Sequence, residues 1–377
     1  MAPSPHLNPD AGEAGVDLDH PAAANPGGLA GERRWRPRRV LITRAAREWA
    51  HGRGMAERCA ALGLPVVERA NDRLALGEIG YAEAKSTLAI VVASPGKLRL
   101  QPIAPSADWR LDLAEGCPAH CSYCYLAGSL KGPPVTRAYA NLLEIFDAAA
   151  RHLGQGRVTS RSGKRAHEGT TYEASCYTDP LGIEHLTGSL AATIAHFGTW
   201  NADAQLRFTT KFDAVEPLLG IAHNGRTRMR VSLNPAAFAR FEGGTAKVAA
   251  RIAGMRRMAF AGYRMGLTIA PIIAAKGWQA AYGGLIRDVA AALAGAPDCD
   301  LTIEFITHRF SATSKSVLES WYPGSALDMS STDRAEKRTK FGSIKHVYDE
   351  TTMTGLRDWF ENQIDTLLPR ARVLYWT

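Results

Sequence analysis

Short apolar runs alternate along the chain with longer segments in which apolar residues recur every three or four positions. The short runs predict strands at 109–113, 170–175, 205–211, 228–233, 266–273 and 301–307. The longer segments predict helices at about 140–154, 183–198, 214–221, 245–262, 278–294 and 313–321. Strands that alternate with helices of this length form parallel βαβ units, and runs that are apolar on both faces are typical of a sheet covered by helices. We therefore predict an α/β fold built on a partial (β/α)6 barrel, with active-site residues where strands end and loops begin.

The segments on either side of this repeat have a different pattern. Residues 1–38 are rich in Pro, Ala, Gly and charged residues without periodicity, which predicts a disordered basic arm. Residues 39–105 hold short apolar runs around a helical stretch, which predicts a small α/β lead-in layer. The barrel is expected over 106–325. Residues 326–377 are expected to form a C-terminal extension with a basic stretch, a helix and a strand.

Composition and charge narrow the class of protein. At 46% hydrophobic and 22% charged residues, the chain is typical of globular proteins, which excludes fibrous and fully disordered classes. The formal charge of +8 suits a polyanionic partner such as nucleic acid, although an Arg-rich proteome explains it equally well. The sequence has no apolar run long enough to span a membrane and no secretory signal, so we expect a cytoplasmic protein without a membrane partner.

Three of the six cysteines lie close together, as Cys117, Cys121 and Cys124, directly after a predicted strand. The other three are scattered, unlike a disulfide framework. Three thiolates at this spacing can ligate three irons of a 4Fe-4S cluster and leave the fourth iron open for S-adenosylmethionine (SAM), as in radical SAM enzymes. The alternative is a zinc site with a fourth ligand such as the adjacent His120. Structural zinc sites usually draw on two paired knuckles, and the chain has no second CxxC.

Further motifs follow one another from about residue 40 to the C-terminus. They lie at 84–87, 117–126, 172–176, 182–186, 206–212, 222–225, 231–234, 270–272 and 302–306. In this order they resemble the spore photoproduct lyase family of radical SAM enzymes. The resemblance implies a lyase that repairs a UV-induced thymine dimer, 5-thyminyl-5,6-dihydrothymine, in DNA, with a 4Fe-4S cluster and SAM as cofactors. It also implies an electron donor of the flavodoxin or ferredoxin type.

The resemblance also implies the reaction sequence. In that family the 5′-deoxyadenosyl radical abstracts hydrogen from C6 of the lesion, and the methylene bridge then breaks. A cysteine quenches the remaining thymine radical with a hydrogen atom. Tyrosines relay the radical back, so that SAM is regenerated.

Three catalytic residues are carried over from the family. Cys176 ends the second predicted strand and matches the hydrogen-donor cysteine, whereas a lone cysteine without such a match is most often a small buried hydrophobe. Tyr123 and Tyr125 match the paired tyrosines that flank the third cluster cysteine, and Tyr123 is also expected to form a wall against the adenine of SAM. Either tyrosine could instead be an ordinary packing aromatic.

The SAM-binding candidates all lie at predicted strand ends or just after them. Lys211 matches a family position for an ionic contact with SAM, Ser232 and Asn234 end the next strand, and Thr178 and Asp179 follow the donor cysteine. Each of them could instead cap a strand or form a turn.

The DNA-binding candidates are basic residues near the C-terminus, namely His308, Arg309, Lys315, Arg338 and Lys340. The family extrudes the lesion from the duplex, which costs a few kcal/mol. For any single residue of this set, the alternative is a solvated surface charge.

The sequence departs from the family at two positions on the substrate side. Tyr177 and Thr178 follow the donor cysteine where the family usually has Thr-Ser, and the basic stretch at 337–346 is shorter and poorer in aromatic residues. Two other hypotheses therefore stay open. One is a paralogous radical SAM enzyme that acts on another nucleic acid, a peptide or a small molecule. The other is a basic zinc- or cluster-bearing nucleic-acid-binding protein without enzymatic activity.

Overall fold

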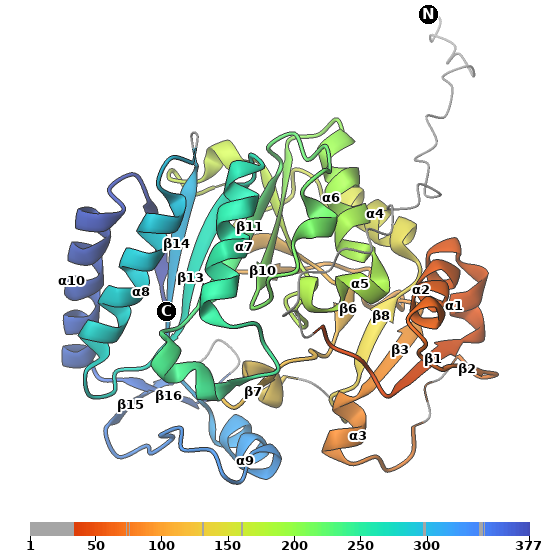
Figure 1. The fold of residues 1–377 in the computed structure, drawn as a ribbon, viewed down its shortest axis with the longest axis horizontal. Coiled ribbons are helices and arrows are strands. Elements are labelled where there is room, and N and C mark those ends of the chain that lie inside the picture. The colour runs from red at the N-terminus through yellow and green to blue at the C-terminus, as the bar shows by residue number, and fades with distance from the viewer. Residues whose placement is uncertain are drawn as a thin grey trace, which may run out of the picture.

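The computed structural model describes residues 34–377 except 73, 75, 130, 131, 160, 297, 298, 339–341 and 343. Most of the arm predicted at 1–38 therefore lies outside the described residues. The described part contains two main sheets and a smaller hairpin at one end (Figure 1). No helix of the described part is long and apolar enough to cross a membrane.

The larger sheet has eight strands in the order β17-β14-β13-β11-β10-β9-β5-β4. They are β4 (Gln101–Ile103), β5 (Ala107–Leu111), β9 (Thr170–Ala174), β10 (Ala204–Thr210), β11 (Thr227–Leu233), β13 (Arg264–Ile272), β14 (Leu301–Thr307) and β17 (Arg372–Trp376). All neighbours from β5 to β17 are parallel, and β4 is antiparallel to β5. The six predicted barrel strands are all present in the predicted order, which confirms the partial (β/α)6 barrel.

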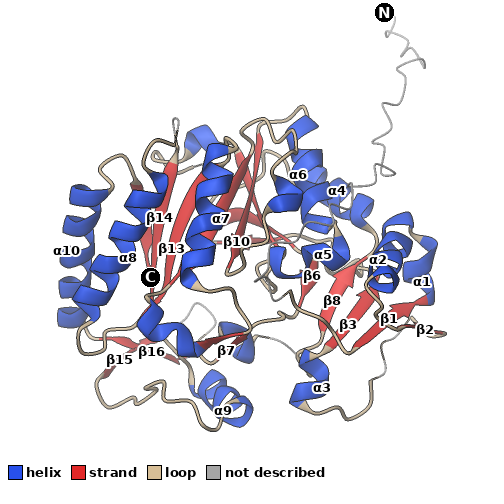
Figure 2. Ribbon diagram, viewed as in Figure 1, coloured by secondary structure: helices blue, strands red, loops and turns tan. Residues whose placement is uncertain are grey.

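Helices cover one face of this sheet, as Figure 2 shows for α6, α7, α8 and α10. The principal helices of the sheet are α4 (Leu142–Arg151), α6 (Ser189–Thr199), α7 (Val248–Phe260), α8 (Trp278–Leu293) and α10 (Glu350–Leu367). The helix predicted at 183–198 is interrupted at Gly188, whose φ of +63° separates α5 (Glu184–Thr187) from α6. The helix predicted at 214–221 was wrong. Only a 3-10 turn (Glu216–Leu218) forms there, because Pro217 has no N–H to donate and Gly220 follows.

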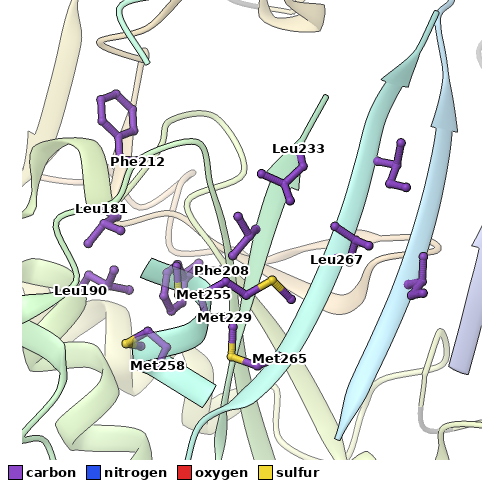
Figure 3. Close-up of a cluster of buried hydrophobic side chains, with 14 of the residues drawn as sticks. Leu181, Leu190, Phe208, Phe212, Met229, Leu233, Met255, Met258, Met265 and Leu267 are labelled. Carbon is purple, nitrogen blue, oxygen red and sulfur yellow. The ribbon is translucent and has the colours of Figure 1, made fainter. Parts of the chain in front are cut away.

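The two faces of the sheet differ in chemistry. On the helix side, Phe208, Met229 and Met265 pack with Met255 and Met258 of α7, all of them buried (Figure 3). On the opposite face the alternate positions of the same strands are polar and also buried, among them Arg207, Arg228, Arg230, Ser232 and Glu304. The prediction of strands apolar on both faces was therefore wrong for these strands. The buried polar and charged side chains of these strands therefore lie on the face opposite the helices.

The smaller sheet has the order β2-β1-β3-β8-β6. Its strands are β1 (Arg39–Thr43), β2 (Val66–Arg69), β3 (Thr87–Val91), β6 (Ala114–Glu115) and β8 (Thr136–Tyr139), with helices α1 (Arg44–Glu48), α2 (Ala50–Ala61) and α3 (Tyr81–Lys85). Two of these strands, β6 and β8, follow residue 105 in sequence, so barrel-side residues complete the lead-in sheet. Because β5 belongs to one sheet and β6 to the other, the cysteine loop leaves from their junction.

The C-terminal segment returns to the barrel. A hairpin of β15 (Arg334–Arg338) and β16 (Ile344–Tyr348) follows α9 (Ala312–Trp321), and the chain then forms α10 and β17. Strand β17 pairs in parallel with β14, and the rings of Trp376 and Phe305 stack with centroids 4.2 Å apart. The segment expected as an extension thus supplies an edge strand of the large sheet.

Candidate active site

The cysteine loop runs from β6 to a 3-10 turn at Tyr125–Gly128 and is held by a distant loop. Within it, β7 (His120–Cys121) pairs in antiparallel fashion with β12 (Glu242–Gly243), and the Ser122 N–H donates to the Phe241 carbonyl at 2.9 Å. At the start of the loop, Gly116 has φ +76°, and a Cβ there would lie 2.2 Å from the Val135 carbonyl oxygen. Only glycine fits this approach, so the loop can leave β6 close to β8.

The thiols of Cys117, Cys121 and Cys124 lie within the electrostatic influence of two lysines. Burial raises the pKa of each thiol, to about 11 for Cys117, while the Lys85 ammonium lowers it at Cys117 and Cys124 and the Lys211 ammonium lowers it at Cys121 and Cys124. The Cys124 thiol also acts electrostatically on the other two thiols, and the Cys117 thiol acts on Cys121. Three thiols beside two ammonium groups fit a thiolate-bound iron–sulfur cluster, because the lysines stabilise the thiolate ligands.

The alternative zinc ligand, His120, has another partner. Its Nδ1 lies 3.2 Å from the Tyr81 hydroxyl. Among the described residues, no three His, Cys, Asp or Glu side chains, those of the cysteine loop included, are grouped closely enough to hold a single metal ion.

A buried carboxylate, Glu242, connects three of the predicted site residues. Its Oε1 accepts hydrogen bonds from the Lys211 ammonium at 2.8 Å, from Asn234 Nδ2 at 3.1 Å and from the Tyr123 hydroxyl, and its Oε2 lies 2.6 Å from Arg251 Nη2. Burial alone would raise the Glu242 pKa, but Lys211, Arg251 and the hydrogen bonds lower it to about 2. Sequence reasoning missed Glu242, because a single Glu in a loop carries no motif that distinguishes it from a surface residue.

The charges around Glu242 do not cancel. One carboxylate faces two cations, Lys211 and Arg251, and the Lys211 ammonium also stands 5.5 Å above the Tyr123 ring. These three side chains together carry one excess positive charge beside the cysteine loop, and the Asp179 carboxylate also interacts electrostatically with Arg251. An anionic ligand such as the carboxylate of an amino acid would balance it.

The other predicted SAM residues differ in whether their polar side-chain atoms already have hydrogen-bond partners within the protein. The Asp179 carboxylate accepts hydrogen bonds from the backbone N–H of Lys211 at 2.6 Å, from the Thr210 hydroxyl at 2.8 Å and from the Gly182 N–H at 3.2 Å. These bonds connect the loop after β9 to the end of β10. Asn234 is likewise held by Glu242 and by the Tyr282 hydroxyl, which donates to its Oδ1 at 3.0 Å. Ser232 is buried on β11, and the Thr178 hydroxyl is buried without a partner among the described residues.

Cys176 and Tyr125 meet at the end of β9, although 51 positions separate them. The Tyr125 hydroxyl donates a hydrogen bond to the Cys176 carbonyl oxygen, while the Tyr125 ring is 60% exposed. The preceding residue, Ser175, has φ +56°, an uncommon conformation for a residue other than glycine, and its side chain accepts the Leu113 N–H at 2.9 Å. This turn joins the loop that carries Cys176 to the start of the cysteine loop.

The Cys176 side chain is a neutral thiol at physiological pH. Burial raises its pKa far above the usual range, and the neighbouring carboxylates of Asp112 and Glu173 raise it further, against the opposite effect of Arg110 and Arg230. A protonated S–H group can give a hydrogen atom, whereas a thiolate cannot. The electrostatics thus suit a hydrogen donor better than a thiolate nucleophile.

The residue after Cys176, where the sequence departs from the family, has its own packing partner. The Arg110 guanidinium lies 4.3 Å from the Tyr177 ring centroid, and Arg110 Nε is 2.8 Å from Asp112 Oδ2. Tyr177 is therefore tied to the end of β5, on the same side as Cys176.

Buried charges on the polar face of the sheet lie next to this site. Arg230 bridges Glu304, with Nη1 2.6 Å from Oε2, and Glu173, and Arg207 lies 3.7 Å from Glu304. The strands' alternation placed these residues inward, but sequence reasoning did not select them.

The predicted DNA-binding residues are not brought together as one surface. His308 is only 2% exposed, and burial and Arg334 lower its pKa to about 4, so it is a neutral interior ring and not a phosphate contact in this structure. The Lys315 ammonium donates to the Met329 carbonyl at 2.9 Å. Arg309 and Arg338 are exposed, Arg338 on the β15–β16 hairpin, and Lys340 lies outside the described residues.

Comparison with known proteins gives a consistent set of relatives. A family model described as spore photoproduct lyase matches residues 35–377. Spore photoproduct lyases of Bacillus subtilis (strain 168) and Geobacillus sp. (strain Y412MC61) are each 35% identical over 348 residues, which cover 90% of this chain and 98% of each relative.

Solved structures agree with these sequence matches. A spore photoproduct lyase complexed with dinucleoside spore photoproduct superposes with a TM-score of 0.83 at 35% identity, covering 92% of this chain and 100% of that one. A variant with bound AdoMet and dinucleoside spore photoproduct gives a TM-score of 0.82 at the same identity and coverage.

Proposed function

Because the chain belongs to the spore photoproduct lyase family, we propose that it is a radical SAM lyase that repairs spore photoproduct in DNA. The observation that carries the proposal is the contact of Tyr125 with Cys176 at the end of β9, one loop away from the three cysteines. The Tyr125 hydroxyl thus contacts the backbone of the residue that carries a neutral thiol, an arrangement with no use in a zinc-bearing binding protein. A reaction that leaves a carbon radical requires such a hydrogen donor.

Cys117, Cys121 and Cys124 are the residues that would hold a 4Fe-4S cluster. When bound, the cluster and SAM supply an electron and a carbon-centred radical. The AdoMet-bound relative supports a SAM site in this chain. Lys211 is its carboxylate partner in our assignment, since the Lys211–Glu242–Arg251 group has an excess positive charge. Tyr123 is fixed by Glu242 as a wall of the same site, and the unpaired Thr178 hydroxyl is free to donate or accept there.

Two of the other SAM candidates act indirectly, by positioning residues of the site. Asp179 and Asn234 have their polar atoms engaged within the protein and position Lys211 and Glu242, and Ser232 remains a candidate contact on β11.

Cys176 and Tyr125 complete the substrate side. The neutral Cys176 thiol donates its hydrogen atom to the thymine radical that remains after the bridge between the two thymines is broken. Tyr125 then restores the hydrogen to the Cys176 sulfur, and its exposed ring leaves it open to the site. The two relatives solved with dinucleoside spore photoproduct support this class of substrate.

DNA is bound in our assignment by exposed basic residues of the C-terminal part, among them Arg309 and Arg338. Arg338 stands on a hairpin whose two strands also carry Arg334, Lys337 and Lys345. Phosphate contacts by such residues release counterions and give a salt-dependent affinity. We also assign an electron donor of the flavodoxin or ferredoxin type and a cytoplasmic location, where thiols remain reduced.

The test is an anaerobic repair assay. The reconstituted protein is expected to hold about four irons and four sulfides per chain. Incubated with dithionite, SAM and dinucleoside spore photoproduct, it should release thymidine products without net loss of SAM. Cys117→Ala should abolish both iron binding and repair, while the matched variant Cys299→Ala, at the opposite end of the sheet, should keep them. Cleavage of SAM without repair would instead favour a paralogous enzyme with another substrate, and bound zinc would contradict both.

A further inference from the structure

Both ends of helix α3 form hydrogen bonds with the cysteine loop. At its first residue, the Tyr81 hydroxyl contacts His120 Nδ1 at 3.2 Å. At its last residue, the Lys85 ammonium donates hydrogen bonds to the carbonyl oxygens of Cys117 and Ala119. Lys85 belongs to the 84–87 motif, which the proposed reaction leaves without a role.

Lys85 is a buried cation, only 6% exposed. In the described part of the chain, no carboxylate comes within ion-pair distance of its Nζ, and its hydrogen-bond partners are neutral carbonyls. An ammonium group in such a place is costly unless an anion compensates it. The nearby groups that can become anionic are thiols, since Lys85 acts electrostatically on Cys117 and Cys124.

The second lysine near the thiols differs in this respect. Lys211 has Glu242 at 2.8 Å and shares that carboxylate with Arg251. Of the two lysines that act on the thiols, Lys85 is therefore the one without an ion pair to a carboxylate among the described residues.

We propose that Lys85 is a positioning residue for the iron–sulfur cluster, which fixes the loop through the Cys117 and Ala119 carbonyls and sets the reduction potential through its charge. The inference rests on the cluster of the proposed function. A 4Fe-4S core with three thiolates is negatively charged, and it becomes more so when it accepts an electron from the reductant. A fixed cation in a buried site stabilises the reduced form more than the oxidised form and so raises the potential.

Three variants separate charge from structure. Lys85→Gln keeps hydrogen-bond donors but removes the charge, Lys85→Arg keeps the charge, and Lys164→Met removes an exposed lysine before β9, at the other end of the sheet. Each protein is reconstituted anaerobically, its iron content is measured, and its cluster is titrated with dithionite and followed by electron paramagnetic resonance.

At a fixed solution potential, we expect the ratio of reduced to oxidised cluster to be tenfold smaller in Lys85→Gln than in the wild type. This corresponds to a reduction potential lower by 59 mV for a one-electron couple. Lys85→Arg and Lys164→Met should titrate as the wild type does. Failure of Lys85→Gln to take up iron, while Lys85→Arg takes it up, also supports the requirement for charge. A Lys85→Gln protein with wild-type iron content and wild-type potential overturns the inference.

Variants that fail to fold are recognised by circular dichroism of the apo proteins. In that case Lys85→Met, which matches the volume of the side chain without its charge, replaces Lys85→Gln, and the same titration decides. A wild type without a cluster contradicts the proposed function itself. The two failures are thus distinguishable.

Discussion

Replacing Glu242 by Gln tests the central electrostatic group of the site. Glu242 is buried between Lys211 and Arg251, and its side chain has no solvent exposure. The substitution keeps the shape of the side chain but removes the negative charge. It therefore leaves the buried Arg251 and the half-buried Lys211 without their carboxylate partner.

The expected loss of stability follows from the pKa. The Glu242 pKa falls from 4.5 to about 2 in the folded protein, and each unit corresponds to about 1.4 kcal/mol, so the carboxylate contributes about 3 kcal/mol at pH 7. Removing one partner from a buried ion pair costs about 3–5 kcal/mol, which agrees with this figure. We expect Glu242→Gln to lower the free energy of unfolding by about 3 kcal/mol.

The pH dependence gives the sign of the effect. A carboxyl whose folded pKa is depressed contributes stability that is fully present above its unfolded pKa, here 4.5, and lost as the pH falls through about 2. The difference between the wild type and Glu242→Gln should therefore be constant from neutral pH down to about pH 5. It should shrink below that pH, because the protonated Glu242 resembles Gln.

The assay is urea denaturation of the anaerobic apo proteins at pH 7 and at several lower pH values where both remain folded. Glu57→Gln, an exposed substitution on α2, serves as the control and should change stability by about 0.5 kcal/mol or less. A difference below about 1 kcal/mol at pH 7, or one that does not vary with pH, would refute the reasoning.

Three further substitutions test the substrate side. Cys176→Ala should leave iron content and SAM cleavage intact but divert the thymine radical to adducts, and a normal yield of thymine products by chromatography would remove Cys176 from the mechanism. Tyr125→Phe loses the hydroxyl bound to the Cys176 carbonyl and should consume more SAM per lesion repaired, whereas unchanged stoichiometry would argue against the relay. Arg338→Ala should weaken binding to lesion-bearing DNA and lower the slope of log affinity against log salt by about 1, and an unchanged slope would mean that Arg338 contacts no phosphate.

Local patterns in the sequence were enough to predict the fold and to select the proposed cluster ligands. The strands and most of the helices follow from periodicity, since each is decided by residues within one element. The three cysteines could be selected because their spacing within one loop reports their chemistry directly. Cys176, Tyr123 and Tyr125 needed the family resemblance, since nothing local separates them from packing residues.

In the C-terminal part, local sequence patterns did not predict how the segments pack against the barrel. The strand predicted in the C-terminal extension is present as β17, but its pairing with β14 depends on the whole barrel being in place. His308 was selected as a basic residue for DNA, yet its burial beneath Arg334 became visible only when the hairpin was placed against it.

By itself, then, the sequence determined the open α/β barrel, the position of the cysteine loop and the family to which the chain belongs. Only the tertiary structure decided which charges surround the site. Glu242 reaches Tyr123 across 119 positions of the chain, Tyr125 reaches Cys176 across 51, and Lys85 reaches Cys117 across 32. The physical reason is that electrostatic energies depend on burial and distance, which are properties of the packed molecule and not of any one segment.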